Sequence, residues 1–66
     1  MFTPIVRGTC SIPNHHTVTL TQVDENLWEV QVSDNEPSFW ECEVSALMEF
    51  TDSIREEQAG IHRYDV

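Results

Sequence analysis

Residues 17–23, 28–32 and 40–44 alternate apolar and polar side chains, and this alternation constrains the fold more than any other feature of the sequence. The segment 27–33 reads LWEVQVS, and the segment 39–45 repeats it closely as FWECEVS. Side chains at alternate positions of a β-strand lie on one face of a sheet. Two neighbouring strands that cover the same core need the same pattern, so the repeat predicts two half-buried strands side by side. The segment TVTLTQV at 17–23 predicts a third.

The loop before the first copy of the repeat sets the register of its strand. A three-residue loop over 24–26, with Asn26 in the left-handed conformation, joins the two strands as a hairpin. This loop places Leu20 opposite Val30, so that the apolar side chains of both strands share one face. In the same register Val18 lies opposite Val32.

The loop between the two copies leads to a functional hypothesis. A five-residue loop over 34–38 places Val30 opposite Cys42 on the inner face and Glu29 opposite Glu43 on the outer face. The other pairs of this register are Val32 with Trp40, Trp28 with Val44, and Gln31 with Glu41. Like charges directly opposite destabilise a strand pair by roughly 0.2–1 kcal/mol. The outer face is therefore expected to carry an acidic cluster that a basic partner would neutralise.

The pattern changes to a helical period after the second copy of the repeat. Ser45 is a suitable N-cap and Gly60 a suitable stop, so we predict a helix at about 46–59. Its apolar stripe is expected to lie across the sheet face that carries Trp28 and Trp40. The stripe consists of Leu47, Phe50 and Ile54, and the acids Glu49, Asp52 and Glu56 lie opposite.

A second interpretation of the same segment starts the helix at Ser38. Ser38 and Glu41 would then form a capping box, and Cys42 would face solvent. This version leaves a lone hairpin beneath a long helix, so we adopt the version with three strands.

The N-terminal segment is expected to add a strand between Pro4 and Pro13, because proline is tolerated only at the borders of strands. Its inward positions are Val6, Gly8, Cys10 and Ile12. The predicted fold class is therefore α+β, a small antiparallel β-meander of three to four strands packed against one C-terminal α-helix. We expect a single domain over 1–66.

The charge of the chain restricts its partners. Twelve acidic residues stand against three arginines, without any lysine, and give a formal net charge of −9. Nucleic acids and anionic membranes bind through cations that replace counterions, so neither is expected as a direct partner. No apolar segment reaches the roughly 20 residues of a membrane span, and residues 1–10 lack the features of a signal peptide. We therefore expect a cytoplasmic protein with reduced cysteines.

Metal binding and catalysis find little support in the sequence. The zinc ligands available are Cys10, His15, His16, Cys42 and His62, but no pair has the short spacing of a zinc motif. A zinc-stabilised mini-domain is therefore only a third hypothesis. Glu41 and Glu43 lack an environment that would separate their pKa values. With two glycines in the chain there is no phosphate-binding loop. We expect no cofactor and no enzymatic activity.

The leading hypothesis is a non-enzymatic acidic binding module. Its concrete form is a small inhibitor of the sort that mobile elements carry. Such an inhibitor would engage a basic, nucleic-acid-binding surface of a protein partner by mimicking DNA or RNA. The expected partner-binding residues are Glu29, Asp34, Glu36, Glu41 and Glu43. The alternative is a structural or assembly subunit whose acidity serves solubility. A homodimer would supply the additional buried surface that so short a chain lacks.

Overall fold

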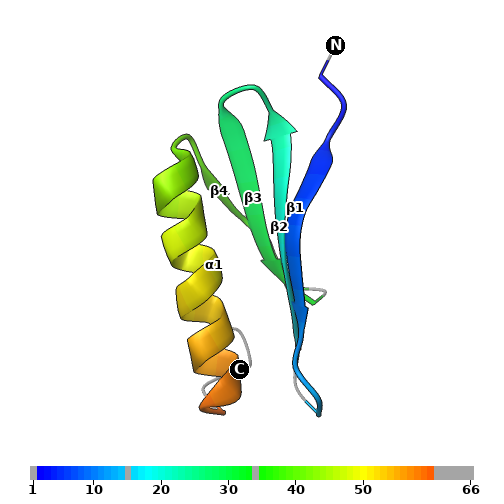
Figure 1. Cartoon of the computed structure of the whole chain (residues 1–66), viewed down its shortest axis with the longest axis vertical. Coiled ribbons are helices and arrows are strands. Elements are labelled where there is room, and N and C mark those ends of the chain that lie inside the picture. The colour runs from blue at the N-terminus through cyan, green and yellow to red at the C-terminus, as the bar shows by residue number, and fades with distance from the viewer. Residues whose placement is uncertain (1, 15, 34, 61–66) are drawn as a thin grey trace.

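The computed structural model describes residues 2–14, 16–33 and 35–60, and it confirms the predicted α+β class. A four-stranded antiparallel sheet, with its strands in the order of the sequence, carries one helix on one face (Figure 1). The elements are β1 (Ile5–Ser11), β2 (Thr17–Asp24), β3 (Leu27–Val32), β4 (Ser38–Trp40) and α1 (Glu43–Gln58).

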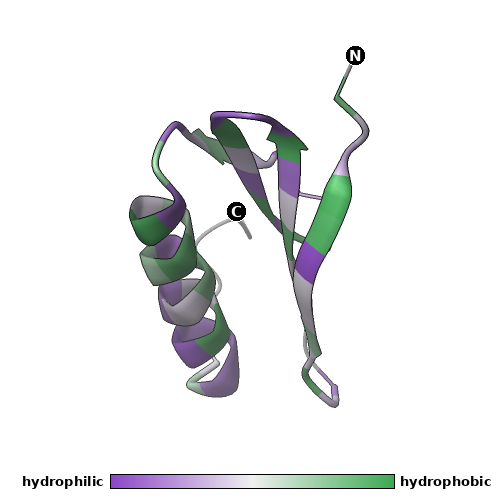
Figure 2. Ribbon diagram, turned by 45° about the horizontal axis from the view of Figure 1, so that its top comes forward, coloured by the Kyte–Doolittle hydropathy of each residue, from purple (hydrophilic) through white to green (hydrophobic). Residues whose placement is uncertain are grey.

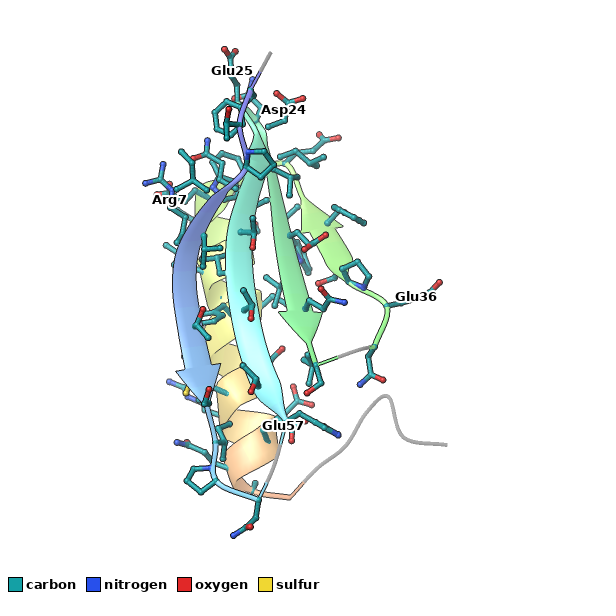
Figure 3. All side chains as sticks on the ribbon, turned by 90° about the vertical axis from the view of Figure 1, so that its right-hand side faces the viewer. Arg7, Asp24, Glu25, Glu36 and Glu57 are labelled. Carbon is teal, nitrogen blue, oxygen red and sulfur yellow. The ribbon has the colours of Figure 1, made fainter. Side chains whose placement is uncertain are left out.

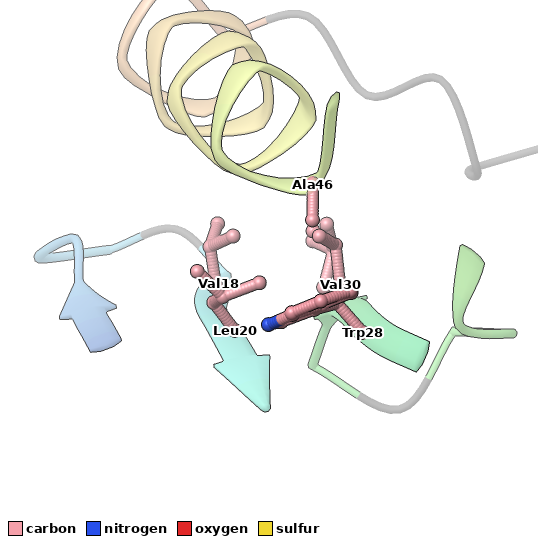
Figure 4. Close-up of a cluster of buried hydrophobic side chains, with 6 residues drawn as sticks. Val18, Leu20, Trp28, Val30 and Ala46 are labelled. Carbon is pink, nitrogen blue, oxygen red and sulfur yellow. The ribbon is translucent and has the colours of Figure 1, made fainter. Parts of the chain in front are cut away.

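The pair β2–β3 forms the centre of the core in the predicted register. Leu20 lies opposite Val30, and Val18 lies opposite Val32. Figure 2 shows the alternation of apolar and polar residues along these strands. The extra residue of the hairpin is accommodated by a bulge at Val23, and Asn26 is not among the residues with a positive φ, so its expected left-handed conformation was wrong. The buried apolar residues are Val18, Leu20, Trp28, Val30, Val32 and Ala46 (Figure 4).

The predicted register of the next pair was wrong. Trp40 lies opposite Trp28, which comes four residues before the predicted partner Val32 in β3. A shift by an even number of residues keeps each side chain on its face, so Trp40 still packs against the core. Glu29 lies opposite Phe39 instead of Glu43. The like-charge contact on the outer face therefore does not exist.

The loop before β4 explains the shift. The last residue of β3 pairs with β2, and the backbone N–H of Ser33 then donates to the carbonyl of Thr17 over 2.7 Å. Ser33 takes a positive φ of 48°, which turns the chain back. The Gln31 amide donates to the carbonyl of Asn35 over 3.0 Å and holds the loop against the strand. Because the loop folds back along the end of β3, pairing with β4 begins only at Val30, which lies opposite Ser38.

The helix begins between the two predicted starts. It starts at Glu43, with Cys42 as an exposed N-cap whose side chain makes no capping hydrogen bond. The expectation that Cys42 is a core residue on a strand was therefore wrong. The chain leaves the sheet after Trp40, and Gly60 follows the helix with a φ of 79°, as its predicted role as a stop requires.

The face of α1 that packs on the sheet is only partly the predicted stripe. Its buried residues are Ala46, Ser53 and Glu57. Phe50 and Ile54 are half-buried against the core, whereas Leu47 is 44 % exposed, contrary to expectation. The helix packs on β2, β3 and β4, and its C-terminal half is also held by a 2.7 Å contact between His16 Nδ1 and Glu57 Oε1.

The first strand forms as predicted but contains a bulge. Val6 lies opposite Thr21 and Gly8 opposite Leu20, so Arg7 is the extra residue. The bulge turns Val6 to the outer face, contrary to the expected pattern, while Gly8 stays on the face that carries the helix. A Cβ on Gly8 would lie 3.4 Å from the Phe50 ring, so glycine lets this ring approach the strand.

Candidate protein-binding surface

The structure disperses the five acids that the sequence grouped together. Glu29 stands on the outer face between Thr21 and Phe39, as the sheet register requires. Glu36 is exposed in the loop between β3 and β4, away from the β2–β3 turn (Figure 3). Asp34 lies outside the described residues. The predicted row of carboxylates along the sheet is therefore absent from the described strands, where the outward-facing acids are Glu29 and, opposite Leu27 at the end of β2, Asp24.

Glu41 instead lies near two acids of the β2–β3 turn, Asp24 and Glu25, and Glu43 is the first residue of α1. This turn and the start of α1 occupy the same end of the molecule (Figure 1). The acidic hollow, an open depression of about 500 Å³ at this end, is lined by Asp24, Glu25, Asn26, Leu27 and Glu41. We call Asp24, Glu25, Glu41 and Glu43 together the acidic end; none of them forms an ion pair within the described part of the chain.

Sequence reasoning missed Asp24 and Glu25 because it treated them only as turn residues. The signal was the hairpin itself, which brings the DEN turn to the end of the sheet where β4 stops and the helix begins. Glu43 also has a structural role, since a carboxylate in the first turn interacts favourably with the helix dipole.

A second depression lies between the helix and the first strand. The α1–β1 groove, of about 230 Å³, is lined by Arg7, Leu20, Trp28, Glu43 and Leu47. It exists because the helix packs on β2, β3 and β4, so that the inner face near β1 remains partly uncovered. Leu20 and Trp28 form its buried apolar floor, and the exposed side chains of the other three residues form its walls.

Trp28 has a buried hydrogen-bond donor without an acceptor. Its side chain is 8 % exposed, and among the described residues its Nε1 has no partner. Figure 4 shows the ring lying beneath the helix with its nitrogen directed toward Leu20, on the side of the groove. An unsatisfied buried donor costs about 1–3 kcal/mol, so this feature needs an explanation.

Arg7 is held at the wall of the groove by the neighbouring strand. Its Nε and Nη2 both donate to Oε1 of the buried Gln22, and the Gln22 amide donates to the carbonyl of Glu25 over 3.3 Å. The bulge in β1 directs the Arg7 side chain to this position. This chain of bonds links the groove to the turn at the acidic end.

Cys42 is an exposed thiol at the start of the helix. The backbone N–H of Ser45, followed by that of Val44, lowers the pKa of this thiol below the ordinary value, because N–H groups near the sulfur favour the thiolate even though the side chain makes no capping hydrogen bond. Cys10 is a half-buried thiol on β1.

The described residues do not assemble the candidate zinc ligands. No group of three or more His, Cys, Asp and Glu side chains suited to a metal lies within 2–14, 16–33 and 35–60. His16 is bonded to Glu57, while His15 and His62 lie outside these ranges. Within the same ranges, no helix is long and apolar enough to cross a membrane.

Comparison with known proteins gives no match. The sequence matches no protein-family model, no curated protein is similar to it, and no solved structure matches it. The functional argument therefore rests on the acidic end and the α1–β1 groove.

Proposed function

We propose that the protein is a non-enzymatic binding module that engages a basic surface of a protein partner in the cytoplasm. The acidic end carries this proposal, because three of its carboxylates line one hollow and none of its four acids forms an ion pair within the described part of the chain. Such a cluster attracts cationic surfaces and accelerates association with them. The formal net charge of −9 acts in the same direction over longer range.

The concrete form of the proposal is a small inhibitor of a nucleic-acid-binding protein, of the sort that mobile elements carry. A surface that binds phosphates also accepts a cluster of carboxylates. On the helix, Glu49, Asp52 and Glu56 follow one another at axial steps of about 4.5 and 6 Å. DNA presents a phosphate every 3.4 Å or so of axis on each strand, a spacing of the same order. Mimicry by carboxylates of the acidic end and the helix is therefore part of the proposal.

A second candidate function is that of a structural or assembly subunit whose acidity serves solubility. It is favoured by Val44 and Met48, which are 64 % and 63 % exposed on the outer side of α1. Exposed apolar side chains of this kind suit a homodimer or a larger assembly. Sedimentation equilibrium separates the two functions, because an assembly subunit associates with itself as the concentration rises.

The test of the leading proposal combines capture with charge variants. The immobilised protein is expected to retain a basic protein from a lysate at low salt and to release it at high salt or on addition of duplex DNA. Surface plasmon resonance with the purified partner should then show slower association for the double variant Glu41→Gln, Glu43→Gln. Glu36→Gln, in the distant loop, is the matched control. If neither added salt nor the double variant changes the affinity or the association rate, the proposal is wrong and the acids serve solubility.

A further inference from the structure

The α1–β1 groove combines several features that suit the binding of a side chain from another molecule. It has an apolar floor, a buried donor without an acceptor at Trp28 Nε1, and one acid and one base among the residues that line it. Buried donors are normally satisfied, so this one indicates an acceptor that arrives from outside the described residues. The nitrogen has almost no solvent-accessible surface, so an acceptor reaches it only when a side chain of the groove wall moves aside.

The size of the groove limits what it can hold. Pockets for cofactors and other small molecules usually measure about 300–1,000 Å³. At about 230 Å³ the α1–β1 groove suits a single large side chain from a protein partner. Anchors of this type fill pockets at the centres of interfaces and contribute most of the binding energy.

We propose that the α1–β1 groove binds one tyrosine side chain from a basic segment of the partner. The aromatic ring lies on Leu20 and Trp28, and the phenolic oxygen accepts a hydrogen bond from Trp28 Nε1. The Arg7 guanidinium packs on the ring face as a cation. Leu47 has an exposed side chain, so a change of its rotamer would admit the hydroxyl group to the buried nitrogen.

The basic character of the segment follows from the charges around the groove. Glu43 lines its wall, and the carboxylates of the acidic hollow lie at the same end of the molecule. Lysine or arginine residues on either side of the tyrosine would face these acids. This inference rests on the proposed function for the charge of the partner, whereas the anchor itself is argued from the groove alone.

Four synthetic peptides separate the anchor from the charge. They are Ac-Lys-Arg-Tyr-Arg-Lys-NH₂, its two variants with phenylalanine or glycine at the centre, and Ac-Glu-Glu-Tyr-Glu-Glu-NH₂. Each is titrated into the ¹⁵N-labelled full chain and followed by NMR. The basic tyrosine peptide should shift the indole N–H signal of Trp28 downfield, since it gains an acceptor. The phenylalanine peptide should bind about tenfold more weakly without this shift, and the glycine peptide more weakly still.

Two variants of the protein complete the test. Trp28→Phe removes the donor, so the tyrosine and phenylalanine peptides should then bind with equal affinity. Leu47→Ser should weaken the tyrosine peptide about tenfold, whereas Met48→Ser, on the far side of the helix, should leave it unchanged. The ¹⁵N spectrum of each variant shows directly whether it is folded, and the peptide series gives its answer on the parent chain alone.

The outcomes distinguish the two proposals. If both tyrosine peptides bind the groove equally, the anchor site stands and the basic partner is wrong. If all three basic peptides bind equally and perturb only the acidic end, the basic partner stands and the anchor site is overturned. Binding that shifts the indole of Trp40 instead of Trp28 also overturns the anchor site.

Discussion

The two tryptophans beneath α1 differ in the hydrogen bonding of their indole nitrogens. On the side of β4, Trp40 is half-buried and its Nε1 donates to the Ser38 hydroxyl over 2.9 Å. On the side of β1, Trp28 is more deeply buried and its Nε1 has no acceptor among the described residues. The two residues lie directly opposite each other on adjacent strands. Trp40 therefore finds its acceptor on its own strand, two residues away, whereas the described residues around Trp28 offer none, and this unused donor lies beside the α1–β1 groove.

The largest expected effect is a difference in stability between variants at the floor of the groove and variants at its wall. Leu20→Ala removes a side chain that is 2 % exposed and should lower the free energy of unfolding by about 2–5 kcal/mol. Leu47→Ala, on the wall at 44 % exposure, should cost less than about 1 kcal/mol. Urea denaturation of both variants checks this. Equal losses would mean that the wall is part of the core and that the groove is closed.

The next effect concerns the two ends of the helix. Glu57 is buried and bonded to His16, whereas Cys42 gives the first turn no capping bond. Glu57→Ala leaves a half-buried imidazole without this partner and should cost about 1–3 kcal/mol. Gln58→Ala, at an exposed neighbouring position, is the control. Thermal unfolding of both variants measures the difference, and a harmless Glu57→Ala would show that the contact does not hold the helix on the sheet.

A smaller effect is expected when the indole N–H of Trp40 loses its acceptor and so becomes unsatisfied, as that of Trp28 already is. Ser38→Ala removes the acceptor of Trp40 Nε1 and should cost about 0.5–1.5 kcal/mol. The cost should be at the lower end if water replaces the hydroxyl, since Trp40 is only half-buried. The same measurement on Ser45→Ala, which removes a half-buried hydroxyl elsewhere, gives the background. A loss no larger than that of the control would mean that the side of β4 does not depend on this bond.

The smallest expected effect is chemical. Because the pKa of the exposed Cys42 thiol is lowered, its thiolate persists to lower pH than that of an ordinary thiol. Alkylation by iodoacetamide should therefore label Cys42 before the half-buried Cys10, and the pH midpoint of its alkylation should fall below that of an ordinary thiol. Peptide mass spectrometry over a pH series follows both sites. Faster labelling of Cys10 would contradict the exposed position of Cys42 at the helix start.

The alternation of the sequence predicted which face each strand residue takes better than it predicted which residue lies opposite. Trp40 was placed on the correct face but four residues from its observed partner, because the loop folds back on Gln31. Val6 was assigned to the wrong face because a bulge at Arg7 is invisible to a period-two pattern. The same bulge places Arg7 at the groove, so the site was hidden from sequence reasoning for the same reason.

The acids show the same limit. Their charge could be read from composition, but their grouping depends on where β4 ends and the helix begins. Glu43 was expected on a strand opposite Glu29 and lies instead in the first turn of α1. Only two residues separate Trp40 from the helix, and the observed start at Glu43 matches neither of the predicted N-caps, Ser38 and Ser45.

The most direct test of the account compares the two indole N–H groups in the free protein. In a ¹⁵N NMR spectrum, with Trp28→Phe used to assign the signals, the Trp28 indole proton should resonate upfield of the Trp40 proton because it lacks an acceptor. It should also exchange with solvent more slowly, because its nitrogen is buried. A Trp28 proton that resonates downfield would show that this donor already has an acceptor, and one that exchanges as fast as the Trp40 proton would show that it is open to water. Either result would contradict a buried donor that is unused in the free protein.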